Sequence, residues 1–231
     1  GVMTARYLST KTCSVAVCEM GSDVAMGATR ANSAIVHAGY DAKPGTLKAR
    51  LNVQGNRLMK ELGAAWDFPV RPIGSHVIGF DEGDLKKLRE LYDRGMANGV
   101  PNLKIITGDE LRAMEPNVSP AAHASLWAPS AAITCPYGIT IAAAENAATN
   151  GVHFYFNFKV SGVSEAGGIY YISNGHDTIA AHYVVNAAGV HSAEVAEILG
   201  ENDFPINVIP RRGEYMVLDK TMGHMANSTL F

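Results

Sequence analysis

The chain has 231 residues, more than one average domain of roughly 150 residues and fewer than two. Its 19 Lys and Arg against 22 Asp and Glu give a net charge of −3, which does not support a general nucleic-acid binder, because such proteins carry a basic patch or stripe. The 47% hydrophobic and 18% charged residues indicate a globular protein with a sizeable core, and three cysteines are too few for a disulfide framework or a metal-ligand pattern.

The first elements alternate between helix and strand, as in an α/β protein. Residues 2–9 read as a short helix, and residues 14–18 form a compact β-branched run that the acid Glu19 closes. Leucines then recur at helical spacing and predict an amphipathic helix that Gly63 ends. These leucines are Leu47, Leu51, Leu58 and Leu62.

The middle of the chain continues this alternation. Residues 70–80 resemble a strand, and Pro72 indicates an edge position or a late start. Residues 84–98 predict a helix that stops at an Asn-Gly pair, and Thr107 begins a capping box for a short helix. Pro136 suits the first turn of an alanine-rich helix that ends at residues 150–151.

The period changes to two after that helix. Phe154, Phe156, Phe158 and Val160 alternate and predict one face of a strand. The pair Asn174-Gly175 predicts a hairpin with a type I′ turn. A last helix is expected over residues 192–199, closed by Gly200.

Glu19 is the first candidate functional residue. It ends an apolar strand that follows a helix opened by Gly1. A dinucleotide-binding fold uses an acid in this place to accept hydrogen bonds from the ribose hydroxyls. A surface acid at a strand end explains the same pattern, so Glu19 alone does not separate the two interpretations.

The stretch over residues 27–49 is more informative, because small residues alternate with polar ones. Thr29, Arg30, Asn32 and Ser33 supply hydroxyl, cationic and backbone N–H groups that suit a pyrophosphate. The small side chains of the sequence His37-Ala38-Gly39 allow the backbone to lie against a flat ring.

This stretch, NSAIVHAG followed by PGTLKA, resembles the FAD-binding region of the D-amino-acid oxidase-like (DAO) superfamily of flavoproteins. Within it, the sequence is most similar to the branch of the glycerol-3-phosphate dehydrogenases and L-2-hydroxyglutarate oxidases. The resemblance covers almost the whole chain. It continues through GSHVIGF (74–80), ELRAMEPN (110–117), ITCPYGITIA (133–142), VVNAAGVHS (184–192) and RRGEYMVLDK (211–220).

The resemblance implies FAD as cofactor and a role for each matching position. Gly1 corresponds to the last glycine of the family's GxGxxG motif, and this sequence departs from the family in lacking the first strand and the first two glycines. Glu19 is expected at the ribose, and His37 to Gly39 are expected at the isoalloxazine. The remaining cofactor residues are expected to be Thr29, Arg30, Asn32 and Ser33 along the pyrophosphate and ribityl path, Val160 on the adenine side, and Ala187, Ala188 and Gly189 near the flavin.

Candidate catalytic residues are His37, Arg211 and Arg212. A histidine with a near-neutral pKa suits a base, and an arginine suits a phosphate or carboxylate of the substrate. Adjacent strand residues point to opposite faces, so only one arginine is expected to reach a substrate. A structural histidine and solvated arginines remain the alternatives.

We therefore expect an α/β fold with a Rossmann-like FAD-binding domain, incomplete at its N-terminus, and an inserted α+β substrate domain with a mixed or antiparallel sheet. The FAD-binding domain is expected over residues 1–69 and 131–202, and a truncated substrate domain over residues 70–130 and 203–231.

The expected activity is FAD-dependent oxidation of a small anionic 2-hydroxy compound. Glycerol 3-phosphate is the first candidate by resemblance, and an L-2-hydroxy acid such as L-2-hydroxyglutarate is the second. A non-catalytic fragment that holds no FAD is an alternative of another class. The electron acceptor (quinone, protein or oxygen) stays open. No apolar run reaches the roughly 18 residues of a membrane span, so we expect a cytoplasmic protein and leave peripheral membrane association open.

Overall fold

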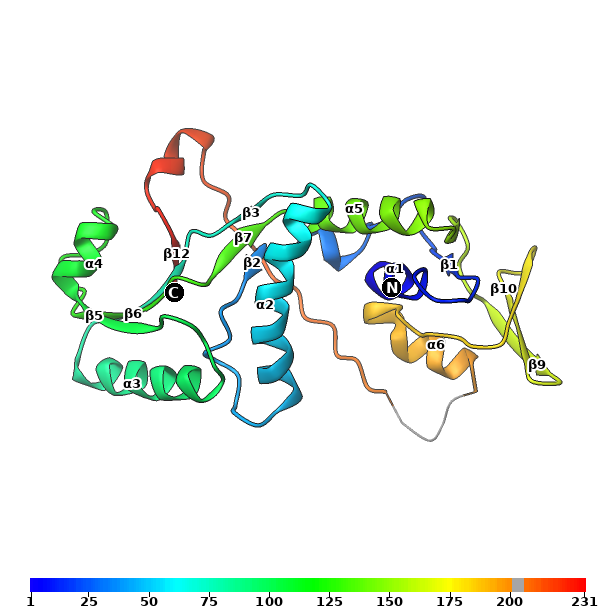
Figure 1. Cartoon of the computed structure of the whole chain (residues 1–231), viewed down its shortest axis with the longest axis horizontal. Coiled ribbons are helices and arrows are strands. Elements are labelled where there is room, and N and C mark those ends of the chain that lie inside the picture. The colour runs from blue at the N-terminus through cyan, green and yellow to red at the C-terminus, as the bar shows by residue number, and fades with distance from the viewer. Residues whose placement is uncertain (201–205) are drawn as a thin grey trace. The chain divides into compact units, whose positions relative to one another are not determined.

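The computed structural model describes residues 1–200 and 206–231, which form two compact units of mixed α/β structure (Figure 1). The first unit contains Gly1–Asn32 and Pro136–Glu214, and the second contains Ser33–Cys135 and Tyr215–Phe231. Parallel and antiparallel strand pairs both occur, as expected for the fold class. The assignment of a cofactor domain and a substrate domain stays a prediction.

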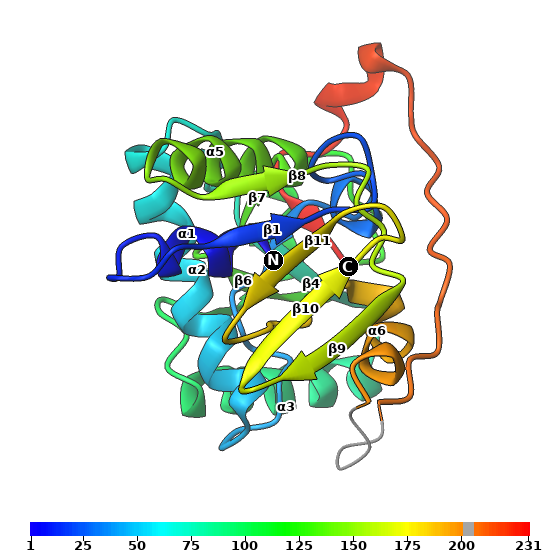
Figure 2. The ribbon, with the colours of Figure 1, turned by 90° about the vertical axis from the view of Figure 1, so that its right-hand side faces the viewer.

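A short parallel pair of strands forms the centre of the first unit. Strand β1 (Ala16–Cys18) runs parallel to β8 (His153–Tyr155), as Figure 2 shows. Helix α1 (Val2–Leu8) packs against α5 (Pro136–Thr149), which begins at the predicted proline. Their shared core is made of small and β-branched residues. It consists of Ala5, Ala147 and Val152, with Val15, Val17 and Phe154 packed against them.

A three-stranded antiparallel sheet completes the strands of this unit among the described residues. It contains β9 (Gly162–Ala166), β10 (Ile169–Ser173) and β11 (Thr178–Ala181), with β10 in the middle. After β11 come the 3-10 helix η2 (Gly189–His191) and helix α6 (Ser192–Ile198).

The hairpin between β10 and β11 is confirmed, but its predicted turn type is wrong. Ser173 pairs with Thr178, which leaves residues 174–177 as a longer loop. Gly175 has a positive φ of 92° but Asn174 does not, whereas a type I′ turn needs both. The Asn174 side-chain oxygen instead accepts hydrogen bonds from the backbone N–H groups of His176 (2.8 Å) and Asp177 (2.7 Å).

The strand predicted from the alternating phenylalanines is shorter than expected. Strand β8 ends at Tyr155, and the backbone then turns at Asn157, whose φ is 55°. Phe158 is buried, and its N–H donates to the carbonyl of Glu19 at 2.9 Å. Val160 therefore lies in the extended link before β9 and not in a strand.

The second unit is built around a four-stranded sheet. Its order is β12 (Thr229–Leu230), β4 (Ser75–Gly79), β6 (Ala124–Ala128) and β5 (Lys104–Thr107). β12 is parallel to β4, and the other pairs are antiparallel. Helix α3 (Glu82–Ala97) packs on this sheet, and Leu88, Leu103 and Leu126 lie in the core between them.

The second unit also has a smaller sheet and two further α-helices. Strand β7 (Ala132–Thr134) lies between β2 (Ile35–Val36) and β3 (Val70–Arg71). Helix α2 (Leu47–Ala65) packs against β3, and the short α4 (Gly108–Met114) follows β5. The second unit also contains the 3-10 helix η3 (Lys220–His224). A further 3-10 helix, η1 (Ala28–Arg30), lies in the first unit.

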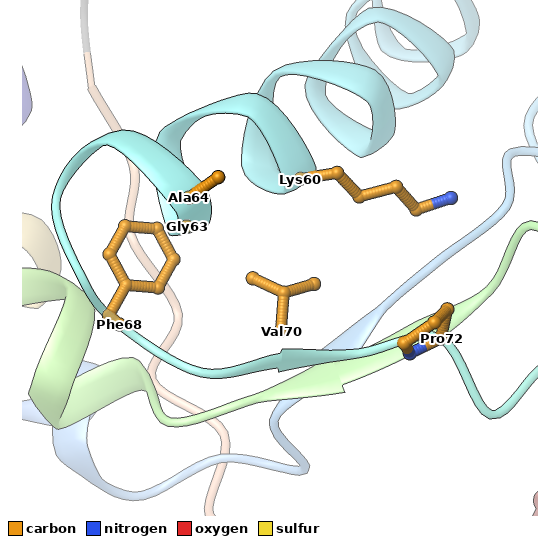
Figure 3. A pocket seen from close by; sticks show the side chains of 6 residues that line it. All are labelled: Lys60, Gly63, Ala64, Phe68, Val70 and Pro72. Carbon is orange, nitrogen blue, oxygen red and sulfur yellow. The ribbon is translucent and has the colours of Figure 1, made fainter.

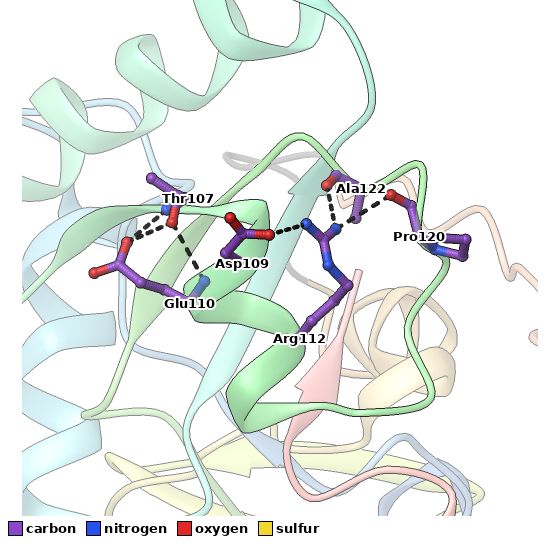
Figure 4. Close-up of polar contacts among 6 residues, drawn as sticks. All are labelled: Thr107, Asp109, Glu110, Arg112, Pro120 and Ala122. Atoms are coloured by element: carbon purple, nitrogen blue, oxygen red, sulfur yellow. Dashed lines mark hydrogen bonds and ion pairs between the residues drawn. The ribbon is translucent and has the colours of Figure 1, made fainter.

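The capping box at α4 is confirmed (Figure 4). The Thr107 hydroxyl accepts from the N–H of Glu110 at 3.3 Å, and the Glu110 carboxylate accepts from the N–H of Thr107 at 2.8 Å. Each side chain thus satisfies a backbone N–H that the first helical turn leaves without a partner. The helix stops at Met114, two residues before Pro116, which cannot continue it.

Residues 70–80 form two strands in different sheets, not the single predicted strand. The break falls at Gly74, whose φ is 73°. A Cβ at this position would lie 2.0 Å from the Trp127 ring, so only glycine fits beneath that indole.

Helix α2 also differs from its sequence prediction. Gly63 lies inside the helix instead of ending it, and a Cβ there would approach a Val70 methyl to 2.7 Å. Leu47 and Leu51 are 61% and 51% exposed, so the leucine stripe is not the buried face. The buried face instead carries Ala49, Asn56 and Gly63. The small residue Gly63 allows the helix to approach Val70 of β3 closely.

Candidate functional site

Glu19 lies directly after the carboxyl end of β1, where parallel strands of α/β folds present ligand-binding groups. Its N–H donates to the carbonyl of Tyr155 at 2.9 Å, so the backbone continues the β1–β8 pairing. One carboxylate oxygen accepts from the N–H of Gly21 at 2.7 Å. Among the described residues the other oxygen has no hydrogen-bond partner, which leaves it able to accept from a ligand hydroxyl.

The structure brings the helix that Gly1 opens close to the loop at residues 187–189. A Cβ on Gly1 would lie 3.6 Å from the Cβ of Ala187. Asn186 organises this loop, because its side chain accepts from the N–H of Ala188 at 3.2 Å and donates to the carbonyl of Ser192 at 2.8 Å. Gly189 has a φ of 59°, so the loop turns there before η2 and α6.

Thr29, Arg30 and Asn32 lie together in and after η1, and all three are exposed. The Asn32 amide donates to the carbonyl of Thr29 at 2.8 Å and closes the turn. Helix α5 packs against η1 and supports it. The turn therefore presents a hydroxyl, an amide and a guanidinium to solvent, which are groups that suit an anion.

Val160, Arg211 and Arg212 are not placed as the sequence suggested. Val160 lies outside a strand, as described above. Arg211 and Arg212 lie within residues 206–219, which form neither a helix nor a strand. The two side chains therefore do not alternate between the faces of a strand, as the sequence had predicted. The Arg212 side chain is 86% exposed and its Nε lies 3.4 Å from the Glu214 carboxylate.

The other predicted site residues lie in the second unit, after β2. His37 is exposed, whereas Val36 and Ala38 on either side of it are buried. The His37 ring stacks on Phe231 with ring centroids 6.0 Å apart and planes 22° apart. Gly39 has a φ of 109°, and a Cβ there would lie 2.6 Å from a Val53 methyl. Ser33 is exposed at the start of this unit.

Two asparagines that sequence reasoning missed hold the backbone around His37. Asn56 on α2 donates to the carbonyls of His37 (3.1 Å) and Ser130 (2.9 Å). Asn98, which caps α3, donates to the carbonyls of Gly39 (2.9 Å) and Ala42 (2.7 Å). For Asn56 the sequence held a weak signal, because asparagine is disfavoured inside a helix, but nothing in the sequence identified the carbonyls that it bonds.

A buried polar cluster in the second unit also went unpredicted. His76 has 0% exposed surface, stacks on Trp127 at 4.3 Å and contacts the Ser125 hydroxyl through Nδ1 at 2.9 Å. Burial lowers the pKa of His76 from 6.5 to about 4, although the Glu115 carboxylate acts in the opposite direction. Glu115 itself accepts from the N–H of Asn227 (2.8 Å) and the hydroxyl of Ser228 (2.5 Å). It thereby attaches the C-terminal segment to the unit.

The second unit has a pocket of about 410 Å³ between α2 and β3 (Figure 3). Its lining is mainly apolar, and the Lys60 ammonium at one end donates to the carbonyl of Ser130 at 2.9 Å. The lining residues are Lys60, Gly63, Ala64, Phe68, Val70 and Pro72. None of the residues predicted from the sequence to bind cofactor or substrate lines this pocket.

Within residues 1–200 and 206–231, no group of three or more His, Cys, Asp or Glu side chains is arranged to hold a metal ion. No helix of those residues is long and apolar enough to cross a bilayer.

Comparison with known proteins links this geometry to a family. The family model described as DAO, FAD dependent oxidoreductase, matches residues 1–230. A glycerol 3-phosphate dehydrogenase from Caloramator mitchellensis is 40% identical over 100% of this chain and 48% of its own length. A mitochondrial L-2-hydroxyglutarate dehydrogenase from Mus musculus is 29% identical over 100% of this chain and 52% of its own.

Among solved structures, an L-α-glycerophosphate oxidase from Mycoplasma pneumoniae with FAD bound has a TM-score of 0.79 and is 26% identical. The match covers 85% of this chain and 53% of that one. The chain therefore spans about half the length of the relatives it matches.

Proposed function

Because the chain belongs to the DAO family of FAD-dependent oxidoreductases, we propose that its protein oxidises glycerol 3-phosphate to dihydroxyacetone phosphate. The observation that carries this proposal is the 40% identity to a glycerol 3-phosphate dehydrogenase over the full chain. The substrate class, a small anionic 2-hydroxy compound, agrees with the exposed cations and histidine described above.

The residues of the first unit fit a dinucleotide. Within residues 1–200 and 206–231, one carboxylate oxygen of Glu19 has no partner at the end of a parallel strand, where it would accept from ribose hydroxyls. The turn at Thr29, Arg30 and Asn32 would bind the pyrophosphate through groups that already face solvent. The loop at residues 187–189, beside the start of α1, would lie along the cofactor.

The flavin, when bound, supplies a two-electron acceptor for the hydride of the substrate C–H bond. The chain's own residues orient the substrate and move its proton. An imidazole nitrogen of His37 would accept the hydroxyl proton, because the ring is exposed on an otherwise buried stretch of backbone. Arg211 or Arg212 would bind the substrate phosphate through charge-assisted hydrogen bonds.

An L-2-hydroxy acid is the second candidate substrate, and the relatives named L-2-hydroxyglutarate dehydrogenase favour it. The same residues would serve, with an arginine meeting a carboxylate instead of a phosphate.

The experiment is anaerobic flavin reduction in the full-length protein that contains this chain. Glycerol 3-phosphate is expected to bleach the flavin band and yield dihydroxyacetone phosphate, whereas L-2-hydroxyglutarate is not. Bleaching by L-2-hydroxyglutarate alone supports the second candidate. A full-length protein that cannot be reconstituted with FAD contradicts both and supports a non-catalytic role.

A further inference from the structure

Residues 36–42, here called the 36–42 loop, contain the exposed side chain of His37 among mostly buried neighbours. Val36, Ala38 and Ala42 are all buried, so the loop backbone is packed into the unit while the His37 side chain faces out. Such a loop places a side chain at one fixed position only if its backbone cannot shift. The contacts that fix it are therefore functional candidates.

Asn56 fixes the loop from the side of α2. It is 7% exposed, and its amide nitrogen lies 3.1 Å from the carbonyl oxygen of His37 and 2.9 Å from that of Ser130. The same nitrogen also lies 3.4 Å from the carbonyl oxygen of Val36, so its two hydrogens serve three backbone carbonyls, two of them in the loop. Asn56 thus joins the backbone of His37 itself to the turn before β7.

Asn98 fixes the other end of the loop from α3. Its amide nitrogen donates to the carbonyls of Gly39 and Ala42, at 2.9 and 2.7 Å. Arg94, one turn earlier on the same helix, donates to the carbonyl of Asp41 at 2.7 Å. Three backbone carbonyls after His37, those of Gly39, Asp41 and Ala42, are therefore bonded to the last turn and cap of one helix.

We propose that Asn56 and Asn98 are positioning residues that hold the 36–42 loop so that the His37 imidazole occupies one place for proton transfer. The proposal rests on the proposed function, in which His37 accepts the substrate proton. Neither asparagine needs to touch substrate or cofactor for this role. Their effect passes through the carbonyls of His37 and Gly39.

The test uses Asn56→Asp and Asn98→Asp, which keep the side-chain size and remove the donating nitrogen. Gln54→Glu is the matched control, because Gln54 is exposed on the same helix as Asn56 and the change adds the same charge. Each variant is made with His37 intact and with His37→Gln in the FAD-loaded, full-length protein. Flavin reduction by substrate is then followed at saturating substrate.

We expect Asn56→Asp and Asn98→Asp to slow flavin reduction on the order of 10-fold to 100-fold when His37 is present, with FAD content unchanged. In the His37→Gln background, each should change the rate by less than about 2-fold, because the residue they position is gone. Equal slowing in both backgrounds, or no slowing with His37 present, would overturn the proposal.

Backbone amide exchange in protein without FAD gives a readout that does not depend on turnover. Both aspartate variants should raise exchange within residues 36–42 by about 10-fold and leave β4 and β6 unchanged, whereas Gln54→Glu changes neither. Unchanged exchange in the loop would contradict the proposal even if neither substrate reduces the flavin. If only the proposed function is wrong, neither substrate reduces the flavin, but the two aspartate variants still raise amide exchange in the 36–42 loop.

Discussion

Acidification should destabilise the second unit through His76, and the size of the effect follows from its surroundings. The imidazole has no exposed surface, stacks on Trp127, and its pKa is lowered to about 4. At pH 7.5 and above the residue is almost fully neutral in both the folded and the unfolded state, so it adds almost nothing to the pH dependence there. Between pH 6.5 and 4 the unfolded state binds more protons, and stability therefore falls as the pH falls.

The two pKa values give the magnitude. At pH 5 the loss relative to pH 7.5 is about 2 kcal/mol, and below pH 4 it levels at about 3 kcal/mol. The Glu115 carboxylate, which favours the protonated ring, is already included in this pKa. Burial raises the pKa of the Tyr40 hydroxyl above its ordinary value, so this group stays neutral across the pH range of the test.

The assay is urea unfolding at pH 7.5 and pH 5, followed by Trp127 fluorescence in a Trp66→Phe background. His76→Asn is the comparison, because it keeps a polar group near Ser125 and cannot titrate. The difference in unfolding free energy between the parent protein and His76→Asn should change by about 2 kcal/mol between the two pH values. A difference that stays constant would refute the account of His76 as a buried neutral base.

Three further predictions concern single residues. Gly39→Ala should destabilise the second unit by about 1–3 kcal/mol in urea unfolding, because its φ is 109° and a Cβ would meet Val53 at 2.6 Å; Gly45→Ala, which also has a positive φ but meets no neighbour, should cost less. Thr107→Ala should cost about 1 kcal/mol by removing the capping box of α4, and an unchanged unfolding midpoint would contradict that role. Glu19→Gln should weaken FAD binding by about 10-fold in fluorescence titration, whereas Glu61→Gln on the exposed face of α2 should leave it unchanged.

The sequence predicted most helices because their ends carry local signals. The capping box at Thr107, Pro136 at the start of α5 and the Asn-Gly pair after α3 each act within a few residues of the chain. The family was predicted from long motifs, and the match over residues 1–230 confirms it.

Two of the errors depend on packing against another element, whereas the wrong turn type at Asn174 has a local cause, its side-chain hydrogen bonds to the next residues. Gly63 continues its helix because Val70 packs against it, and Gly74 breaks a strand because Trp127 lies over it. The leucine stripe of α2 predicted the buried face only in part, because Leu47 and Leu51 are exposed and the buried positions are Ala49, Asn56 and Gly63.

The candidate site divides in the same way. The sequence singled out Glu19, Thr29 and Arg30 as candidates. In the structure Thr29 and Arg30 are exposed, and Glu19 is half-buried. Asn56 and Asn98 were missed, because their role is visible only once residues 36–42 lie against α2 and α3. The roles of His37, Arg211 and Arg212 in catalysis stay predictions.

The most direct test of the central claim is the anaerobic flavin spectrum of the full-length protein on addition of glycerol 3-phosphate. The account predicts that the oxidised flavin band is bleached, that dihydroxyacetone phosphate forms in equal amount, and that His37→Gln slows the bleaching by about 10²-fold to 10⁴-fold without loss of FAD. A flavin that stays oxidised with both glycerol 3-phosphate and L-2-hydroxyglutarate would contradict it.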